Sequence, residues 1–191
     1  AYMHYNYLLA IQDLQPNKGI DKANSIRQIV WKIRAKKVIL ATGSIERPLT
    51  FPNNDRPGIM LANSVSKYLN GYGVNLGKKI VIFTNNDSAY QTAIDCHYQN
   101  VNVVAVIDVR NNLEGELPLK VKQLGIKIYT GSIISNTSGR KKLKTVQIKK
   151  INQKNIEILN CDLLCISGGW SPTVHLLTQS RGKLKFREED S

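Results

Sequence analysis

The sequence predicts an α/β protein, with a three-layer Rossmann-like parallel sheet followed by an antiparallel β-meander. Residues 79–108 read as strand, turn, helix and strand, the pattern of a parallel βαβ unit. Residues 132–160 alternate apolar and polar side chains between turn residues, which is typical of antiparallel hairpins. "CDLLCIS", residues 161–167, is a nearly continuous apolar run, as expected for a strand buried on both faces.

The first part of the chain predicts strands joined by polar connections. Strand-like segments run from Tyr5 to Leu14 and from Ser25 to Ala35. "KVILA", residues 37–41, predicts a short buried strand that Thr42-Gly43 closes. Three prolines between Ile45 and Gly58 predict an irregular connection there.

The middle of the chain carries the predicted parallel sheet and its helices. A helix should start at Asn63 or Ser64, run to about Tyr72 and end at Gly73. The βαβ unit comprises a strand at 79–84, a helix at 87–99 and a strand at 101–108, and a second helix and a third strand are expected at 117–124 and 126–130.

The last elements follow the meander, whose turns we expect at 138–140 and 152–155. After the strand at 161–167, Ser171-Pro172 should open a short helix through about Gln179, because proline suits the first helical turn.

This order of elements matches the second nucleotide-binding domain of flavoproteins with two dinucleotide-binding domains, of the NAD(P)/FAD-binding, disulfide-reductase-like kind. We therefore assign residues 1–62 and 161–191 to parts of a first dinucleotide domain, which the family resemblance described below implies to be NAD-binding. Residues 63–160 would form an inserted second Rossmann-like domain. The N-terminus enters strand-like sequence directly, without the basic segment of a signal peptide, which suggests a piece of a longer protein.

The chain of 191 residues has a formal net charge of +13, which raises the question of nucleic-acid binding. The lysines are scattered, and those in the densest cluster, 141–150, would point outward from a hairpin. This distribution favours an acidic partner subunit or an anionic cofactor over nucleic acid. No apolar run approaches the roughly 20 residues of a membrane span.

The three cysteines, Cys96, Cys161 and Cys165, lack CxxC spacing and are interpreted as buried reduced thiols. They predict a reducing, cytoplasmic compartment. The three histidines, His4, His97 and His175, have no carboxylate or cysteine at metal-ligand or triad spacing. We expect no catalytic residue and no metal site in this chain.

Two glycine-bearing strand ends are candidate ligand contacts. Thr42-Gly43 follows a predicted buried strand, where backbone can approach a ligand, although an ordinary glycine turn explains it equally well. Gly168-Gly169 is the stronger candidate, because the predicted helix after Ser171-Pro172 would point its N-terminus at the glycines. The alternative is that Trp170 packs in the core and the glycines only form a turn.

The turn of the βαβ unit, residues 84–89, contains no glycine. In nucleotide-binding units, glycines allow the tight turn, the approach of pyrophosphate and close helix–strand packing. Here Thr84 and Asn86 place side chains at the approach, and Asp87 or Ser88 would cap the helix internally. Ala89 could serve the packing role. We interpret the unit as structural and expect it to bind no nucleotide.

Three segments together carry a resemblance to a known family: "IRAKKVILATGSIERPLTFPNNDRPGIMLANSVSKYLNGYGV", "VIFTNNDSAYQTAID" and "CDLLCISGGWSPTVHLLTQSRGKLKF". They resemble the alpha subunit of heterotetrameric sarcosine oxidase, and the resemblance covers essentially all 191 residues. It implies an internal segment of a longer subunit, with a glycine-rich dinucleotide fingerprint upstream and a folate-binding part downstream.

The resemblance implies a function for the complex. The family oxidatively demethylates sarcosine to glycine, reduces oxygen to hydrogen peroxide and passes the methyl carbon to tetrahydrofolate. It implies FAD in the beta subunit, FMN at the alpha–beta interface, and NAD in the alpha subunit. The implied partners are the beta, gamma and delta subunits, with neither nucleic acid nor membrane.

Carried onto this sequence, the NAD contacts would fall on two strand ends and the helix that follows the second. They are Ala41, Thr42, Gly43, Gly168, Gly169, Trp170, Ser171, Leu176 and Thr178. The upstream phosphate-binding glycines have no counterpart here, so the segment alone should bind NAD weakly and be inactive. Two alternatives stay open: a subunit of a related amine or opine dehydrogenase, and a nucleotide-free docking module.

Overall fold

The computed structural model describes residues 2–3, 5–14 and 26–186 of the chain. The chain divides into two compact units, which are described separately. The outer unit contains residues 1–45 and 172–191, and the central unit runs from Glu46 to Ser171.

A five-stranded parallel sheet forms the middle layer of the central unit, in the order β5-β12-β6-β7-β8. Its strands are β5 (Ile59–Leu61), β12 (Leu163–Ser167), β6 (Lys79–Thr84), β7 (Asn102–Asp108) and β8 (Lys127–Tyr129). The central strands are buried because apolar layers cover both faces, which explains why they read as continuous apolar runs.

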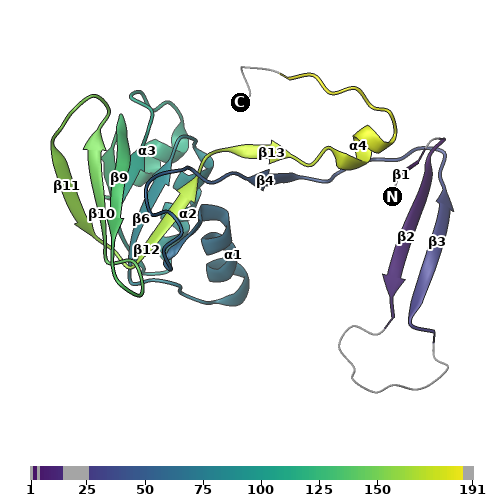
Figure 1. The fold of residues 1–191 in the computed structure, drawn as a ribbon, viewed down its shortest axis with the longest axis horizontal. Helices are drawn as coiled ribbons and strands as arrows, with labels where there is room; N and C mark the ends of the chain where they lie inside the picture. The colour runs from purple at the N-terminus through teal and green to yellow at the C-terminus, as the bar shows by residue number, and fades with distance from the viewer. Residues whose placement is uncertain (1, 4, 15–25, 187–191) are drawn as a thin grey trace. The chain divides into compact units, whose positions relative to one another are not determined.

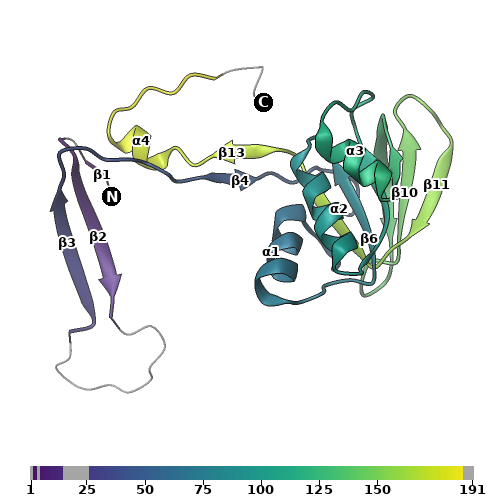
Figure 2. The same ribbon diagram turned by 180° about the vertical axis from the view of Figure 1, so that it is seen from behind.

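Three helices cover one face of this sheet, as Figures 1 and 2 show from opposite sides. They are α1 (Ala62–Tyr72), α2 (Ser88–Tyr98) and α3 (Glu116–Gln123). The first helix buries Ala62, Val65 and Leu69, which recur at helical spacing. It ends at Gly73, whose left-handed backbone (φ 65°) suits glycine, as the sequence predicted.

An antiparallel meander covers the other face of the parallel sheet (Figure 1). It consists of β9 (Ser132–Ser138), β10 (Thr145–Lys150) and β11 (Ile156–Asn160), with β10 in the middle. Ile134, Val146 and Ile148 point inward and pack against Phe83 and Ile107 of the sheet. The predicted three-layer α/β class is therefore confirmed.

The outer unit contains a small antiparallel sheet of β1 (Tyr2–Met3), β2 (Tyr7–Asp13) and β3 (Gln28–Arg34), and the helix α4 (His175–Gln179). Segments β4 (Ser44–Glu46) and β13 (Trp170–Pro172) form a further two-stranded sheet.

Two expectations about this region were wrong. Residues 37–41 form no strand, and the side chain of Ile39 is 92% exposed, because the described residues supply no neighbouring strands to cover it. Ser171 and Pro172 belong to strand β13 and do not start a helix, which begins only at His175. Strand β5 lies directly after the predicted irregular connection, at residues for which the sequence predicted no element.

The two units also differ from the predicted domains. β5 and β12 complete the parallel sheet, so residues 46–62 and 161–171 belong with the βαβ unit. The proposal that the outer unit is part of an NAD-binding domain stays a prediction.

All three cysteines are buried and free, as predicted. Burial raises the pKa of the Cys96 thiol to about 11 and that of Cys161 to about 12. Among the described helices, none has the length and apolar character needed to cross a membrane.

Candidate functional site

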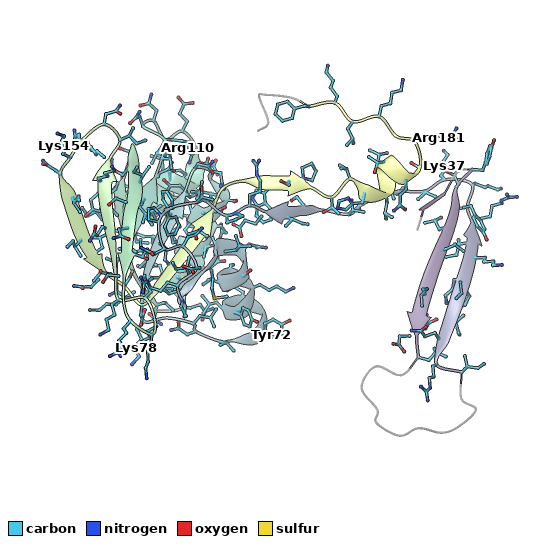
Figure 3. The ribbon with its side chains drawn as sticks, in the orientation of Figure 1. Lys37, Tyr72, Lys78, Arg110, Lys154 and Arg181 are labelled. Carbon is cyan, nitrogen blue, oxygen red and sulfur yellow. The ribbon has the colours of Figure 1, made fainter. Side chains whose placement is uncertain are left out.

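The carboxyl edge of the parallel sheet is the place where such sheets bind ligands. From β6 the chain adds β7 on one side and later returns to add β12 on the other, so the strand order reverses between β6 and β12. Three polar side chains, Thr84, Asp108 and Ser167, end these strands and are fully buried. Figure 3 labels Arg110 at this edge and Lys78 at the opposite one.

The glycine-free turn fills this edge with its own side chains. The Thr84 hydroxyl accepts a hydrogen bond from the Asn86 N–H at 3.1 Å and donates to the Asn86 carbonyl at 3.0 Å. Asn86 Nδ2 donates to the Ser167 hydroxyl at 3.1 Å, which ties the turn after β6 to the end of β12. The side chain of Asn86 therefore bridges β6 and β12 at the position where the strand order reverses.

Asn86 also caps helix α2, a role that the sequence assigned to Asp87 or Ser88. Its Oδ1 accepts hydrogen bonds from the backbone N–H of Ser88 at 3.1 Å and from the Ser88 hydroxyl at 2.6 Å. The Asp87 side chain makes no capping bond, because it faces Arg110 instead.

A charged cluster occupies the ends of β7 and α2. Arg110 Nη2 lies 2.7 Å from Asp87 Oδ1 and 2.8 Å from Asp108 Oδ2, and Arg110 Nε donates to Asp108 Oδ1 at 3.1 Å. The buried Tyr90 hydroxyl donates to Asp108 Oδ2 at 2.8 Å. These carboxylates raise the pKa of Arg110, and burial together with Asp108 raises the pKa of Tyr90.

Within this cluster, the side chains that a nucleotide would contact already pair with one another. An acid at the end of the second strand, where Asp108 lies, binds the ribose hydroxyls in nucleotide-binding units. Here Arg110 and Tyr90 already pair with it. Asp87 at the start of α2 adds negative charge where a phosphate would have to lie. The geometry therefore supports the interpretation that this βα unit is structural.

Gly168 and Gly169 pack against the segment that contains Arg47. The Gly168 N–H donates to the Arg47 carbonyl at 2.6 Å, and the Arg47 N–H donates to the Gly169 carbonyl at 2.8 Å. A Cβ atom on Gly168 would lie 2.8 Å from the carbonyl oxygen of Pro48. Internal packing alone therefore requires glycine at 168.

Trp170 follows these glycines, and its indole N–H donates to the Ser88 hydroxyl at 2.8 Å. The predicted contacts Gly168, Gly169, Trp170 and Ser171 thus lie together at the carboxyl edge of the central unit. The first two engage Arg47, and the third engages Ser88, the first residue of α2.

The other predicted contacts lie in the outer unit. Thr42 donates its hydroxyl to the Thr173 carbonyl at 2.5 Å, and the Thr173 N–H donates to the Gly43 carbonyl at 2.9 Å. Gly43 has a left-handed backbone (φ +67°), and no described atom lies within 4 Å of the place where its Cβ would be. Ala41 is exposed beside them.

Leu176 and Thr178 lie on α4, where the Thr178 hydroxyl donates to the His175 carbonyl at 2.9 Å. This helix has five residues. It is too short to supply the anion-binding N-terminus that the sequence suggested.

Sequence reasoning missed Glu46, which lies just before the Arg47 segment and is only 6% exposed. Its Oε2 accepts a hydrogen bond from the backbone N–H of Asn63 in the first turn of α1 at 2.9 Å. Burial raises the pKa of this carboxyl group, against the effect of hydrogen bonds from Ser167 and Asn63. The only sequence signal for this contact would have been an acidic residue upstream of a helix whose N-terminal N–H groups need an acceptor.

Among the described residues, no group of three or more His, Cys, Asp or Glu side chains could hold a metal ion. Within the same residues, every buried side-chain nitrogen or oxygen has a hydrogen-bond partner. The carboxyl edge is thus satisfied internally.

No protein-family model matches the chain. Two curated relatives are similar to it along most of its length. Sarcosine oxidase subunit alpha of Corynebacterium sp. (strain U-96) is 40% identical over 193 aligned residues, which cover 95% of this chain and 19% of the relative. The subunit of the same name from Rhizobium meliloti (strain 1021) is 35% identical, covering 81% of this chain and 15% of the relative. The chain therefore spans less than a fifth of the length of these relatives.

Solved structures with a similar fold are oxidoreductases. Thioredoxin reductase from T. acidophilum has a TM-score of 0.62 at 19% identity, covering 82% of this chain and 51% of that one. A FAD-dependent pyridine nucleotide-disulphide oxidoreductase from Desulfovibrio vulgaris also reaches 0.62, at 14% identity, covering 97% and 46%. At these identities the likeness shows the fold alone.

Proposed function

Since the chain belongs to the sarcosine oxidase alpha-subunit family, of which it matches one segment, we propose that it is a non-catalytic part of an oxidoreductase subunit. In this role it supports an NAD site and the assembly of the subunit with its partners. The observation that carries the proposal is the 40% identity over 95% of the chain.

The proposed reaction of the whole complex is the oxidative demethylation of sarcosine. Sarcosine, oxygen and tetrahydrofolate would give glycine, hydrogen peroxide and methylene-tetrahydrofolate. FAD and FMN would be held mainly with the beta subunit, and the gamma and delta subunits would complete the assembly in the cytoplasm. No residue of this chain takes part in a chemical step of the proposal.

Gly43 fits an NAD contact best among the predicted residues. Its open, left-handed backbone leaves space in the direction where any other residue would place a side chain. Gly168 fits less well, because the backbone of Pro48 already occupies the corresponding space. A bound NAD can accept a hydride at its nicotinamide, and the residues of this chain would serve only to hold it.

Uncovered apolar side chains in the outer unit also support the proposal. Ile39 is 92% exposed in the "KVILA" run, and Val30 on β3 is 58% exposed. Such residues normally pack against further structure. A larger dinucleotide domain, completed by other parts of a longer subunit, would cover them.

The experiment compares bound NAD in the full-length subunit with and without the substitution Gly43→Val. We expect the substitution to lower the NAD released on denaturation, because a side chain would enter the open space. Gly125→Val is the matched control, since Gly125 also has a left-handed backbone (φ +75°) and no described atom lies near the place of its Cβ. Unchanged NAD content in Gly43→Val would contradict the assignment.

A nucleotide-free docking module is the second candidate, and the internally satisfied carboxyl edge favours it for the central unit. The two candidates are compatible, because the central unit could dock partners while the outer unit supports NAD. A subunit of a related amine or opine dehydrogenase would be recognised by turnover of those substrates and not of sarcosine by the assembled complex.

A further inference from the structure

A groove lies between helix α3 and strand β8 in the central unit. It encloses a volume of about 430 Å³. Its lining is mainly apolar, with contributions from Leu113, Pro118, Leu119, Ile126 and Ile128. Leu119 is 60% exposed, so part of this apolar lining faces solvent.

The groove adjoins an open sheet edge. Strand β8 is the last strand in the sheet order and pairs with β7 alone among the described strands. The outer edge of such a strand presents backbone N–H and C=O groups that can pair with one more strand. An extended peptide that pairs there can place every second side chain in an adjoining groove.

The two faces of β8 differ in what they offer such side chains: the hollow on the meander side has a mainly polar and charged lining that includes Lys150, Gln153 and Glu157, whereas the groove on the helix side is mainly apolar. On the meander side, Lys127 Nζ lies 3.3 Å from Glu157 Oε1, and the Tyr129 hydroxyl bonds to the same carboxylate. On the helix side, Ile128 and Leu113 pack only partly against the core, next to the groove. Apolar side chains of an added strand would therefore enter on the helix side.

Charge determines what kind of strand fits. Lys122 lines the groove and is exposed, with no ion pair to a described residue. The chain carries a net charge of +13. Pairing of β8 with a second copy would bring together two copies of Lys122 and two chains of high positive charge. This repulsion opposes self-association. A segment with carboxylates beside its apolar residues is complementary.

We propose that the β8 edge and its groove bind an extended, acidic segment of a partner protein by strand addition. An apolar side chain of the partner fills the groove, and a carboxylate two residues away, on the same face of the added strand, pairs with Lys122. The inference rests on the central unit alone and is independent of NAD binding and of the reaction of the complex.

The probe is a synthetic peptide in which leucine and glutamate share one face of the strand, separated by threonine as in Leu-Thr-Glu-Thr-Leu, titrated into the purified chain. We expect saturable binding in fluorescence anisotropy and amide chemical-shift changes centred on residues 126–130. Lys122→Glu should weaken binding about 5- to 10-fold at low salt, with a smaller effect at high salt. Leu119→Asp should weaken it further, because it puts a charge in the apolar lining.

Lys120→Glu is the matched control on the same helix. Lys120 does not line the groove, and its ammonium lies 5.5 Å from the ring centre of Tyr98 on α2. It makes the same change in charge and should bind the peptide within about twofold of the unsubstituted chain. Circular dichroism verifies that all three variants fold.

Three results would overturn the proposal. Equal binding of a peptide with N-methylated backbone amides would show that no strand is added. Self-association of the chain in sedimentation, if it resists the acidic peptide, would show that the edge pairs with a second copy. Absence of peptide binding at millimolar concentration would overturn it as well.

Discussion

Arg110 pairs through Nε and Nη2 with both carboxylate oxygens of Asp108, at 3.1 and 2.8 Å, while Asp108 itself is fully buried at the end of β7. The two residues are only two positions apart, so the turn after the strand folds the guanidinium back over its own strand end. This arrangement neutralises an acid at the position where nucleotide-binding units need it free.

Arg110→Gln should destabilise the chain, because it leaves the buried Asp108 charge without its partner. We expect a loss of about 2–4 kcal/mol in the free energy of unfolding, reduced from the value for a fully buried pair because Arg110 is one-third exposed. Urea denaturation measures it, with the exposed Arg140→Gln as control. Equal stability of the two variants would show that the pair is unimportant.

Gly168→Ala should destabilise the central unit, since its Cβ would lie 2.8 Å from the Pro48 carbonyl oxygen and force the backbone apart. The expected cost is about 1–3 kcal/mol. Gly71→Ala on helix α1, with open space around it, should instead stabilise by roughly 0.5–1 kcal/mol. Opposite signs in thermal unfolding would confirm the packing role, and equal signs would refute it.

Glu46→Gln should change how stability depends on pH. Burial raises the pKa of Glu46 above its usual 4.5, so the folded chain holds the proton more tightly than the unfolded chain. The stabilisation this provides is complete below about pH 4.5 and is lost as pH rises through the folded-state pKa. Glutamine stays neutral and can still accept the Asn63 N–H.

Relative to the variant, the unsubstituted chain should therefore lose stability as the pH rises from about 4.5 through the folded-state pKa of Glu46. Urea denaturation across this range gives the difference directly. A difference that is constant with pH would show that Glu46 does not titrate in this way.

The three cysteines should resist thiol reagents in the folded chain. All are buried, and the raised pKa values of Cys96 and Cys161, about 11 and 12, leave almost no thiolate near neutral pH. We expect no rapid reaction with Ellman's reagent natively and three reactive thiols in guanidinium. A rapidly reacting native thiol would contradict the burial of at least one of them.

The elements of the βαβ unit could be predicted to within one residue, because their apolar residues are covered within the central unit, by its helices on one face and its meander on the other. Strand β6 occupies residues 79–84 as expected, and β7 begins one residue later than expected. The prediction of a buried strand at "KVILA" failed because an apolar sequence becomes a buried strand only where other strands lie on both sides. That condition cannot be read from the run itself.

The candidate site was only partly predictable. The absence of glycine from the turn indicated a structural unit, but the cap came from Asn86 and not from Asp87. The choice depends on Arg110, which is distant in sequence and attracts Asp87 away from the helix. Gly168 could be identified as a special position, whereas its contact with Pro48 required the fold.

Titration of NAD into residues 1–191 by isothermal calorimetry tests the central claim most directly. The central unit fills its carboxyl edge with Asn86, Asp87 and Arg110, and the outer unit is proposed to hold only part of an NAD site. We therefore expect no saturable heat below about millimolar NAD, corresponding to binding weaker than about 4 kcal/mol. Micromolar affinity, with amide shifts at residues 84–88, would contradict the account.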